Sequence, residues 1–193
     1  MQRVGADRRK RIIFGMIIPC VLLLFLVAAD QVTKYAFKAL HESKGDTVVI
    51  KDFFYFTCVY NSGAAFSFLS DKEWGQTFFK VLTAVALAAF VFFFVLSVKH
   101  KKKWCTYSLS FVIGGTIGNY IDRLLRSAVI DFIGFDFGSY SFPVFNFADI
   151  CLTVGIIMLV VYFLFMDESA PFSKRSRKKR QEKTEEKTEN EDV

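Results

Sequence analysis

Four long apolar runs constrain this chain more than any other feature of its sequence. They span Ile12–Ala29, Phe78–Val98, Trp104–Ile121 and Ala148–Met166, with Lys80 interrupting the second. Each run contains about 18 to 21 residues, close to the roughly 20 that an α-helix needs to cross a ~30 Å hydrocarbon core. The third run is less apolar because it contains Ser, Thr and Gly. With 53% hydrophobic residues and 24 Phe in 193 residues, the composition also favours a membrane protein.

Clusters of basic residues predict the orientation of these spans. One cluster precedes the first run, one joins the second and third, and one follows the fourth: Arg3–Arg11, Lys99–Lys103 and Lys174–Arg180. With four spans all three lie on one side, which the positive-inside rule makes cytoplasmic. The net charge of +6 therefore reflects topology, and we expect no nucleic-acid partner. We interpret the first run as a retained anchor, because Val27-Ala28-Ala29 is only a marginal cleavage site.

The two loops expected on the outer side have the composition of β-strands. Thr47–Phe68 and Val129–Asn146 are rich in β-branched and aromatic residues, and Asn61-Ser62-Gly63 and Gly138-Ser139 supply turn residues. We therefore predict an α-helical membrane protein, a four-transmembrane-helix bundle with a small β-rich extracytoplasmic cap. Its predicted parts are a basic cytoplasmic N-terminus (1–11), a membrane domain (12–166) and a charged, disordered cytoplasmic tail (167–193).

Cysteine and histidine usage argues against metal and disulfide chemistry. The four cysteines form no CxxC pair, and His41 and His100 are too few and too scattered for a metal site. Neither a GxSxG nor an HExxH string occurs. We therefore expect no metal and no cofactor.

Two aspartates lie in surroundings that disfavour a charge. Asp131 is flanked by Ile130 and Phe132, and Asp149 opens the last apolar run. A carboxylate at the edge of hydrocarbon costs several kcal/mol unless it is paired, hydrated or used. Two carboxyl groups brought close together would share one proton and titrate as a unit, which is how aspartic proteases activate water. Asp131 and Asp149 are therefore the candidate catalytic residues.

Polar residues near the first two runs have structural as well as functional interpretations. Asp30 and Lys34 are four residues apart and can form an ordinary helical ion pair. Asp30 is, however, expected at the C-terminal end of the first helix, where an anion is disfavoured. Asn61 is either a turn residue or an amide that contacts a peptide substrate, and the sequence favours the turn.

The end of the third run and the start of the fourth carry further polar residues. Asp122 and Arg123 can form an interfacial charge pair that closes the third helix, and Asn119 shares a helical face with Arg123. Asn146 is a good N-cap, and Asp149 three residues later completes a capping pattern.

Five short motifs follow one another along the chain. They are Asp30-Gln31-Val32-Thr33-Lys34, Asn61-Ser62-Gly63-Ala64-Ala65-Phe66, Gly114-Gly115-Thr116-Ile117-Gly118-Asn119-Tyr120-Ile121-Asp122-Arg123, Val129-Ile130-Asp131-Phe132 and Phe145-Asn146-Phe147-Ala148-Asp149. Together these motifs resemble one family, the lipoprotein signal peptidases (signal peptidase II), which are bacterial intramembrane aspartic endopeptidases. The resemblance covers about Ile12 to Met166.

This resemblance implies an activity and a site. The family cuts prolipoprotein signal peptides just before a cysteine that bears a diacylglyceryl group, so the implied partners are lipid-modified prolipoproteins and membrane lipids. It implies a monomer in the bacterial cytoplasmic membrane, with both termini cytoplasmic and the active site near the outer face. Asp131 and Asp149 are implied as the catalytic dyad, and the implied substrate-binding or supporting residues are Asp30, Lys34, Asn61, Gly63, Asn119, Asp122, Arg123 and Asn146.

Three alternatives remain at the level of sequence. Presenilin-like proteases also use two membrane aspartates, but they carry a GxGD string, whereas this chain has Gly118-Asn119 at the corresponding place. A small proton-coupled transporter could use the aspartates as a relay, although transporters place such groups near the bilayer midplane and here they cluster at one face. A non-catalytic interaction subunit is the third, and substitution of an aspartate by asparagine distinguishes it from an enzyme.

Overall fold

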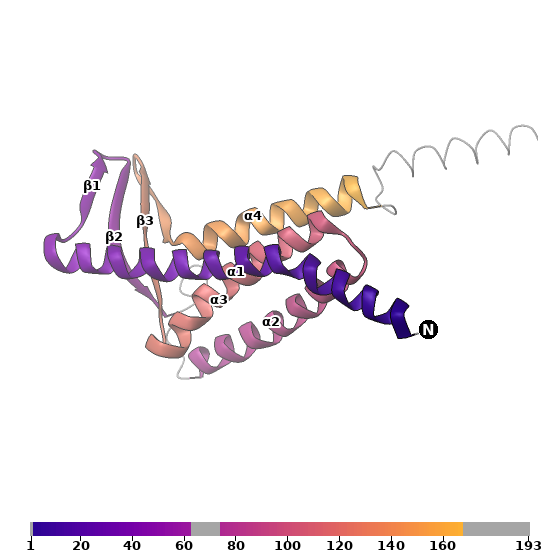
Figure 1. Ribbon diagram of the computed structural model, residues 1–193. Coiled ribbons are helices and arrows are strands. Elements are labelled where there is room, and N and C mark those ends of the chain that lie inside the picture. The colour runs from indigo at the N-terminus through magenta and orange to yellow at the C-terminus, as the bar shows by residue number, and fades with distance from the viewer. Residues whose placement is uncertain (1, 63–73, 168–193) are drawn as a thin grey trace, which may run out of the picture.

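The computed structural model describes residues 2–62 and 74–167. Four helices run side by side, and a small sheet stands at one end of them (Figure 1). Gly63 and the charged tail from residue 168 onward, both singled out by the sequence, lie outside the described residues. The helices are α1 (Gln2–Lys44), α2 (Gly75–Lys99), α3 (Lys103–Arg126) and α4 (Phe147–Val161), with a π-helical turn, η2 (Tyr162–Met166), directly after α4.

Helix α1 is longer than its apolar run. It continues through Asp30 and Lys34 to Lys44, so the expectation that Asp30 lies at a helix C-terminus is wrong. The ion pair between Asp30 and Lys34, one turn apart, supports the helix where the apolar residues end. Gly45 then ends it: its φ is +71°, and its N–H donates to the His41 carbonyl at 2.7 Å, the usual arrangement at a helix C-terminus.

Helix α3 packs against α1, α2 and α4 and buries several serine and threonine side chains. The hydroxyls of Ser108, Ser110 and Thr116 each donate to the backbone carbonyl four residues earlier, at 2.9, 3.1 and 2.7 Å. A Cβ on Gly115 would collide with the Ala148 carbonyl oxygen of α4. Small residues and internally bonded hydroxyls therefore allow α3 to lie close to its neighbours.

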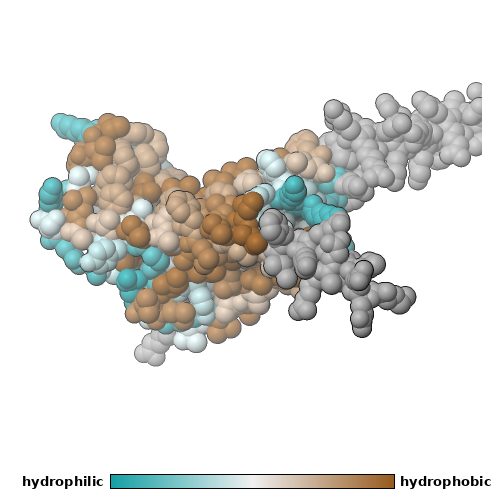
Figure 2. All heavy atoms as spheres, in the orientation of Figure 1, coloured by the Kyte–Doolittle hydropathy of each residue, from teal (hydrophilic) through white to brown (hydrophobic). Residues whose placement is uncertain are grey.

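Within residues 2–62 and 74–167, three helices are long and apolar enough to cross a membrane: Gly15–Lys44, Thr77–Lys99 and Phe147–Met166. They correspond to the first, second and fourth predicted spans. Helix α3, the third predicted span, is not among them, because its Ser, Thr and Gly residues lower its mean hydropathy. Figure 2 shows a broad hydrophobic surface over the helices, with hydrophilic residues toward the two ends of this face. The chain is thus a membrane-embedded, mostly helical protein.

The predicted β-rich segments form one antiparallel sheet of order β1-β2-β3-β4. Its strands are β1 (Thr47–Ile50), β2 (Phe54–Asn61), β3 (Val129–Phe137) and β4 (Tyr140–Phe145). Gly138, with a φ of +65°, and Ser139 make the predicted turn between β3 and β4.

Aromatic stacking attaches the sheet to the helices. The Phe37 ring of α1 stacks on Phe56 of β2 and Phe132 of β3, with ring centroids 4.2 and 4.5 Å apart. In the register of β2 and β3, Val59 lies opposite Asp131 and Asn61 opposite Val129. The sheet therefore holds the end of β2 and the start of β3 against the bundle.

Candidate active site

Five elements bring the predicted polar residues together where the sheet meets the helices. Helix α1, strand β2, helix α3, strand β3 and the start of α4 each contribute side chains. The hydrogen-bonded cluster contains Asp30, Lys34, Asn61, Asn119, Asp122, Asp131, Asn146 and Asp149.

Asp131 on β3 is only 4% exposed. Its Oδ1 accepts a hydrogen bond from Asn146 Nδ2 at 2.6 Å, and its Oδ2 accepts one from Asn61 Nδ2 at 3.0 Å. Burial raises the pKa of this carboxyl from 3.8 to about 6, and the charge of Asp149 acts in the same direction. Asp131 can therefore hold or release a proton near neutral pH.

Asp149 is the third residue of α4 and completes the predicted capping box. Asn146 Oδ1 accepts from the Asp149 backbone N–H at 3.0 Å, and Asp149 Oδ2 accepts from the Asn146 backbone N–H at 3.1 Å. Asp149 Oδ1 also accepts from Asn119 Nδ2 at 2.8 Å. Asp149 can therefore cap helix α4 and belong to the carboxylate cluster at the same time.

The side-chain amides of Asn146 and Asn119 link the two aspartates. Asn146 Nδ2 donates to Asp131 and also to Asn119 Oδ1, at 3.1 Å, while Asn119 donates to Asp149. The side chain of Asn146 is fully buried. The two carboxyl groups, from β3 and α4, thus belong to one hydrogen-bonded unit.

A buried cation lies behind this unit. Lys34 is 2% exposed, and its Nζ lies 2.9 Å from Asp30 Oδ2, 2.9 Å from Asp122 Oδ2 and 2.8 Å from Asn119 Oδ1. These three acceptors match the three N–H donors of an ammonium group. Asp30 Oδ1 accepts from the Ala148 backbone N–H at 2.9 Å, which ties α1 to the start of α4.

The predicted charge pair between Asp122 and Arg123 is wrong. Asp122 instead pairs with Arg126, one turn along α3, at 2.7 Å, and accepts from the Ile130 backbone N–H at 3.2 Å. Adjacent residues on a helix point in different directions, whereas residues four apart share a face. The Arg123 guanidinium donates to the Asn119 carbonyl at 3.4 Å, in keeping with the predicted shared face.

Two residues near the cluster were missed by the sequence analysis. Gln31 Nε2 donates to Asp30 Oδ2 at 3.0 Å and to the Gly118 carbonyl at 3.1 Å. The other residue is Arg126, which could have been identified from its four-residue spacing from Asp122. No sequence signal identifies Gln31, because its partner on α3 is distant in the chain.

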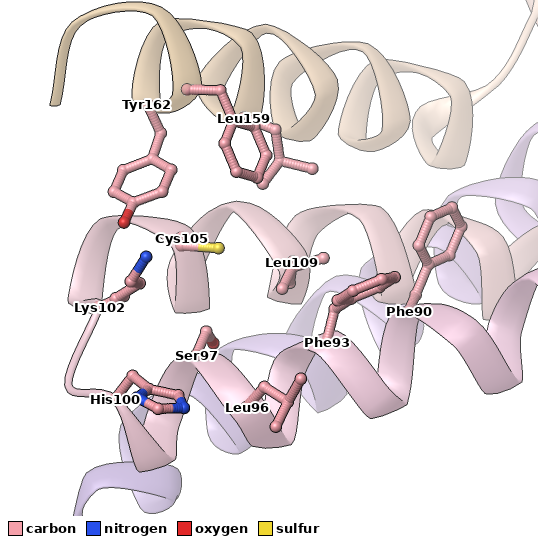
Figure 3. A pocket seen from close by; sticks show the side chains of 11 residues that line it. Phe90, Phe93, Leu96, Ser97, His100, Lys102, Cys105, Leu109, Leu159 and Tyr162 are labelled. Carbon is pink, nitrogen blue, oxygen red and sulfur yellow. The ribbon is translucent and has the colours of Figure 1, made fainter. Parts of the chain in front are cut away.

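The described residues contain two pockets of particular interest. One, of about 390 Å³, adjoins Asp149 and is lined by apolar residues of β4 and α4, including Phe142, Phe145 and Val154. The other, of about 490 Å³, lies between α2, α3 and α4 at the opposite end of the bundle, with His100 and Lys102 at its polar end (Figure 3). Only the first is next to a candidate catalytic group.

The carboxyl cluster can perform acid–base chemistry on water. One carboxylate can accept a proton while its partner donates one, and the amide donors hold both groups in place. Within the described ranges, no three His, Cys, Asp or Glu residues are arranged to hold a metal ion.

Two solved structures, both described as bacterial membrane enzymes, are similar to this chain. The first has a TM-score of 0.64 and 34% identity, covering 76% of this chain and 87% of the other. The second has a TM-score of 0.63 and 34% identity, covering 76% and 92%. The fold and the carboxyl cluster thus define a membrane-embedded enzyme.

Sequence comparison identifies the family. Residues 22–165 match the family model described as signal peptidase (SPase) II. The lipoprotein signal peptidase of Listeria monocytogenes serotype 4a (strain HCC23) is 36% identical over 148 residues, covering 77% of this chain and 93% of that protein. That of Bacillus pumilus (strain SAFR-032) is 40% identical over 147 residues, covering 75% and 90%. This chain belongs to the signal peptidase II family.

Family membership confirms the prediction of an enzyme, and specifically of a peptidase. It also sets aside the transporter and the non-catalytic subunit, which rested on the same aspartates.

Proposed function

We propose that the protein removes signal peptides from prolipoproteins carrying a diacylglyceryl group, cutting before the lipid-modified cysteine, with Asp131 and Asp149 as its catalytic dyad. The observation that carries the proposal is the hydrogen-bonded unit in which Asn146 joins the two carboxyl groups. The names of the relatives, all lipoprotein signal peptidases, support the substrate class.

The reaction follows from a dyad that shares one proton. One carboxylate takes a proton from a water molecule as the water oxygen attacks the scissile carbonyl carbon. The other carboxyl gives its proton to the carbonyl oxygen, which produces a geminal diol. Breakdown of the diol returns a proton to the leaving nitrogen, breaks the C–N bond and restores the dyad. These steps need no covalent intermediate.

We further propose that α3 is a fourth transmembrane helix. Backbone and hydroxyl groups at membrane depth must be bonded within the protein, and the buried hydroxyls of α3 bond to its own carbonyls. The basic residues Lys99–Lys103 then lie on the cytoplasmic side with both termini, and the sheet and dyad lie at the outer face of the bacterial cytoplasmic membrane.

The substrate lipid has a positional role in this proposal. The apolar pocket beside Asp149 suits a substrate that bears an acyl chain, although a chain already in the bilayer gains little by moving there. A lipid that holds the scissile bond at the depth of the dyad makes the reaction nearly intramolecular. Because every residue of the cluster comes from one chain, a monomer suffices.

The test is cleavage of a lipid-modified prolipoprotein in a membrane mimic. We expect Asp131→Asn and Asp149→Asn each to abolish turnover, and the double variant to be hardly worse, because the two groups act as one unit. Asp136→Asn is the matched control, since it makes the same change on β3 outside the cluster. Turnover at the control's level by either single variant would remove that residue from the mechanism.

A second arm tests the role of the lipid. Single-turnover cleavage of unmodified precursor should be much slower than that of modified precursor in the same mimic, even at saturating concentration. Equal maximal rates would show that the lipid serves binding alone.

A further inference from the structure

The two aspartates of the proposed dyad have different surroundings, and the difference indicates which one carries the shared proton. We propose that Asp149 is the ionised base and Asp131 the protonated acid of the resting enzyme, and that Lys34 maintains this division by orienting and polarising the Asn119 amide. The inference rests on the proposed function, because it assigns roles within that dyad.

The surroundings of Asp149 favour its ionised form. It lies in the first turn of α4, where the partial positive charge of the helix N-terminus stabilises an anion. Its two oxygens accept from the Asn146 backbone N–H and from Asn119 Nδ2. Its side chain is only partly buried, so it loses less hydration than Asp131.

Lys34 determines which way the Asn119 amide faces. An ammonium group has only donors, so the Asn119 atom 2.8 Å from Lys34 Nζ must be the carbonyl oxygen. The NH₂ group must then face Asp149. A flipped amide would put N–H donors against the ammonium and an oxygen against the carboxylate.

The same constraint reaches Asp131. Because Asn119 Oδ1 also accepts from Asn146 Nδ2, the second amide presents its NH₂ group to Asp131. A cation on the carbonyl side of an amide also strengthens its N–H as a donor to an anion, since neighbouring hydrogen bonds polarise one another. This effect is direct at Asn119, which faces Asp149, and reaches Asp131 only through a second amide. Lys34 is thus a positioning residue that touches neither dyad carboxyl in the described contacts, and its charge alone lowers the pKa of Asp131 less than burial raises it.

The surroundings of Asp131 favour its neutral form. It lies on a strand, away from any helix terminus, between Ile130 and Phe132, which are 1% and 2% exposed. The raised pKa of Asp131, caused mainly by burial, agrees with this geometry.

The other charges near the dyad reinforce the assignment. Arg123 from α3 interacts most strongly with Asp149, and less with Asp131 and Asp122. Asp30 and Asp122, from α1 and α3, are compensated by Lys34 and Arg126. The charge of Arg123 therefore favours an anion at Asp149 more than at Asp131.

The proton then follows a defined route. The Asp149 carboxylate takes a proton from water, and Asp131 gives its proton to the carbonyl oxygen. In the second half, protonated Asp149 donates to the leaving nitrogen, and the Asp131 carboxylate takes a proton from one hydroxyl of the diol as the C–N bond breaks. The dyad returns to its starting state.

The test is the pH dependence of kcat, whose acidic limb reports ionisation of the base and whose basic limb reports loss of the acid's proton. In Lys34→Met we expect the acidic limb to move to higher pH by about one unit, the size expected for loss of one charge-assisted hydrogen bond. The basic limb should move less, and kcat should fall more than KM changes. Lys38→Met, one turn further along α1 and outside the cluster, with Glu42 and Tyr60 as its partners, is the matched control and should move neither limb.

Two further variants keep the test decisive if Lys34→Met folds poorly. Lys34→Met with Asp30→Asn preserves the balance of buried charge, because Asp122 keeps Arg126. Asn61→Ala removes a donor to Asp131 and should move the basic limb to higher pH without moving the acidic limb. An unmoved acidic limb in a folded Lys34 variant, or an acidic shift in Asn61→Ala, would overturn the assignment. The proposed function is tested separately. If Asp131→Asn and Asp149→Asn are both inactive, the proposed function stands even when the assignment of acid and base is overturned. Activity in either of these two variants would contradict the proposed function itself.

Discussion

Among the described residues, the side chains that hydrogen-bond to the two carboxyls of the proposed dyad are asparagines. Asn61 and Asn146 donate to Asp131, and Asn119 donates to Asp149. A lysine or arginine in direct contact would hold both carboxylates ionised, and neither would then be able to donate a proton. A neutral amide orients a carboxyl group and leaves it free to change charge.

At the residue scale, burial of Asp131 predicts a pH-dependent stability. Its pKa of about 6 in the folded protein lies above the ordinary 3.8, so the native state binds this proton more tightly than the unfolded state. The contribution of Asp131 to stability is therefore fully present below about pH 4 and is lost as pH rises through 6. At pH 8 we expect Asp131→Asn to be more stable than the parent by about 3 kcal/mol. Thermal unfolding in detergent from pH 4 to 8 measures this, and an equal pH dependence in parent and variant would contradict it.

Asn146 allows helix capping and proton chemistry to be separated. Serine caps a helix as well as asparagine does but lacks the NH₂ group that reaches Asp131. Asn146→Ser should therefore keep the melting temperature within a few degrees while kcat falls up to about 10-fold, the size expected for loss of one hydrogen bond to a neutral carboxyl group. Asn146→Ala, which also loses the cap, is the comparison. A Ser variant with normal kcat would show that the Asn146 amide is not needed.

At the scale of elements, apolar runs predicted the positions of α2 and α4 to within a few residues. The length of α1 was underestimated because its final turns depend on an ion pair and a terminal glycine, and apolarity ends earlier. The composition of the two loops predicted that strands would form there, but it did not predict the order of the strands in the sheet. Asn61 and Asp131 are separated by 70 positions, and no local pattern reveals such a contact. Family motifs therefore supplied the list of site residues, and only the fold supplied their partners.

The crossing of α1 and α3 depends on Gly118. A Cβ at this position would collide with the Asp30 carboxylate, so Gly118→Ala should displace Asp30 from Lys34 and from the Ala148 N–H. Overpacking of this kind costs about 1–3 kcal/mol, and we expect both a lower melting temperature and lower activity. Gly15→Ala is the matched control on α1, because its Cβ would meet Val98 at an ordinary 3.7 Å. Equal behaviour of the two variants would contradict the close approach.

At the scale of the whole molecule, the proposed topology is directly testable. Reporter fusions after Arg11, within Lys99–Lys103 and after Arg180 should report the cytoplasm. Fusions near Asp46 and Gly138, at the sheet end of the molecule, should report the outer side. A cytoplasmic result at Gly138 would put the carboxyl cluster on the wrong face for a substrate exported across the membrane.

The central position of α3 has a consequence for how the protein is made. A helix this rich in Ser, Thr and Gly enters the bilayer poorly as an isolated segment, since its insertion depends on apolar side chains. Its hydroxyls bond to its own backbone, but its surface becomes shielded only when α1, α2 and α4 surround it. Only a few residues separate α2 from α3, so the two helices can insert together as a hairpin. In such a hairpin the apolar side chains of α2 offset the poor insertion of α3. With α3 as the proposed fourth span, correct membrane insertion then depends on α2 being synthesised immediately before α3, as it is in this chain.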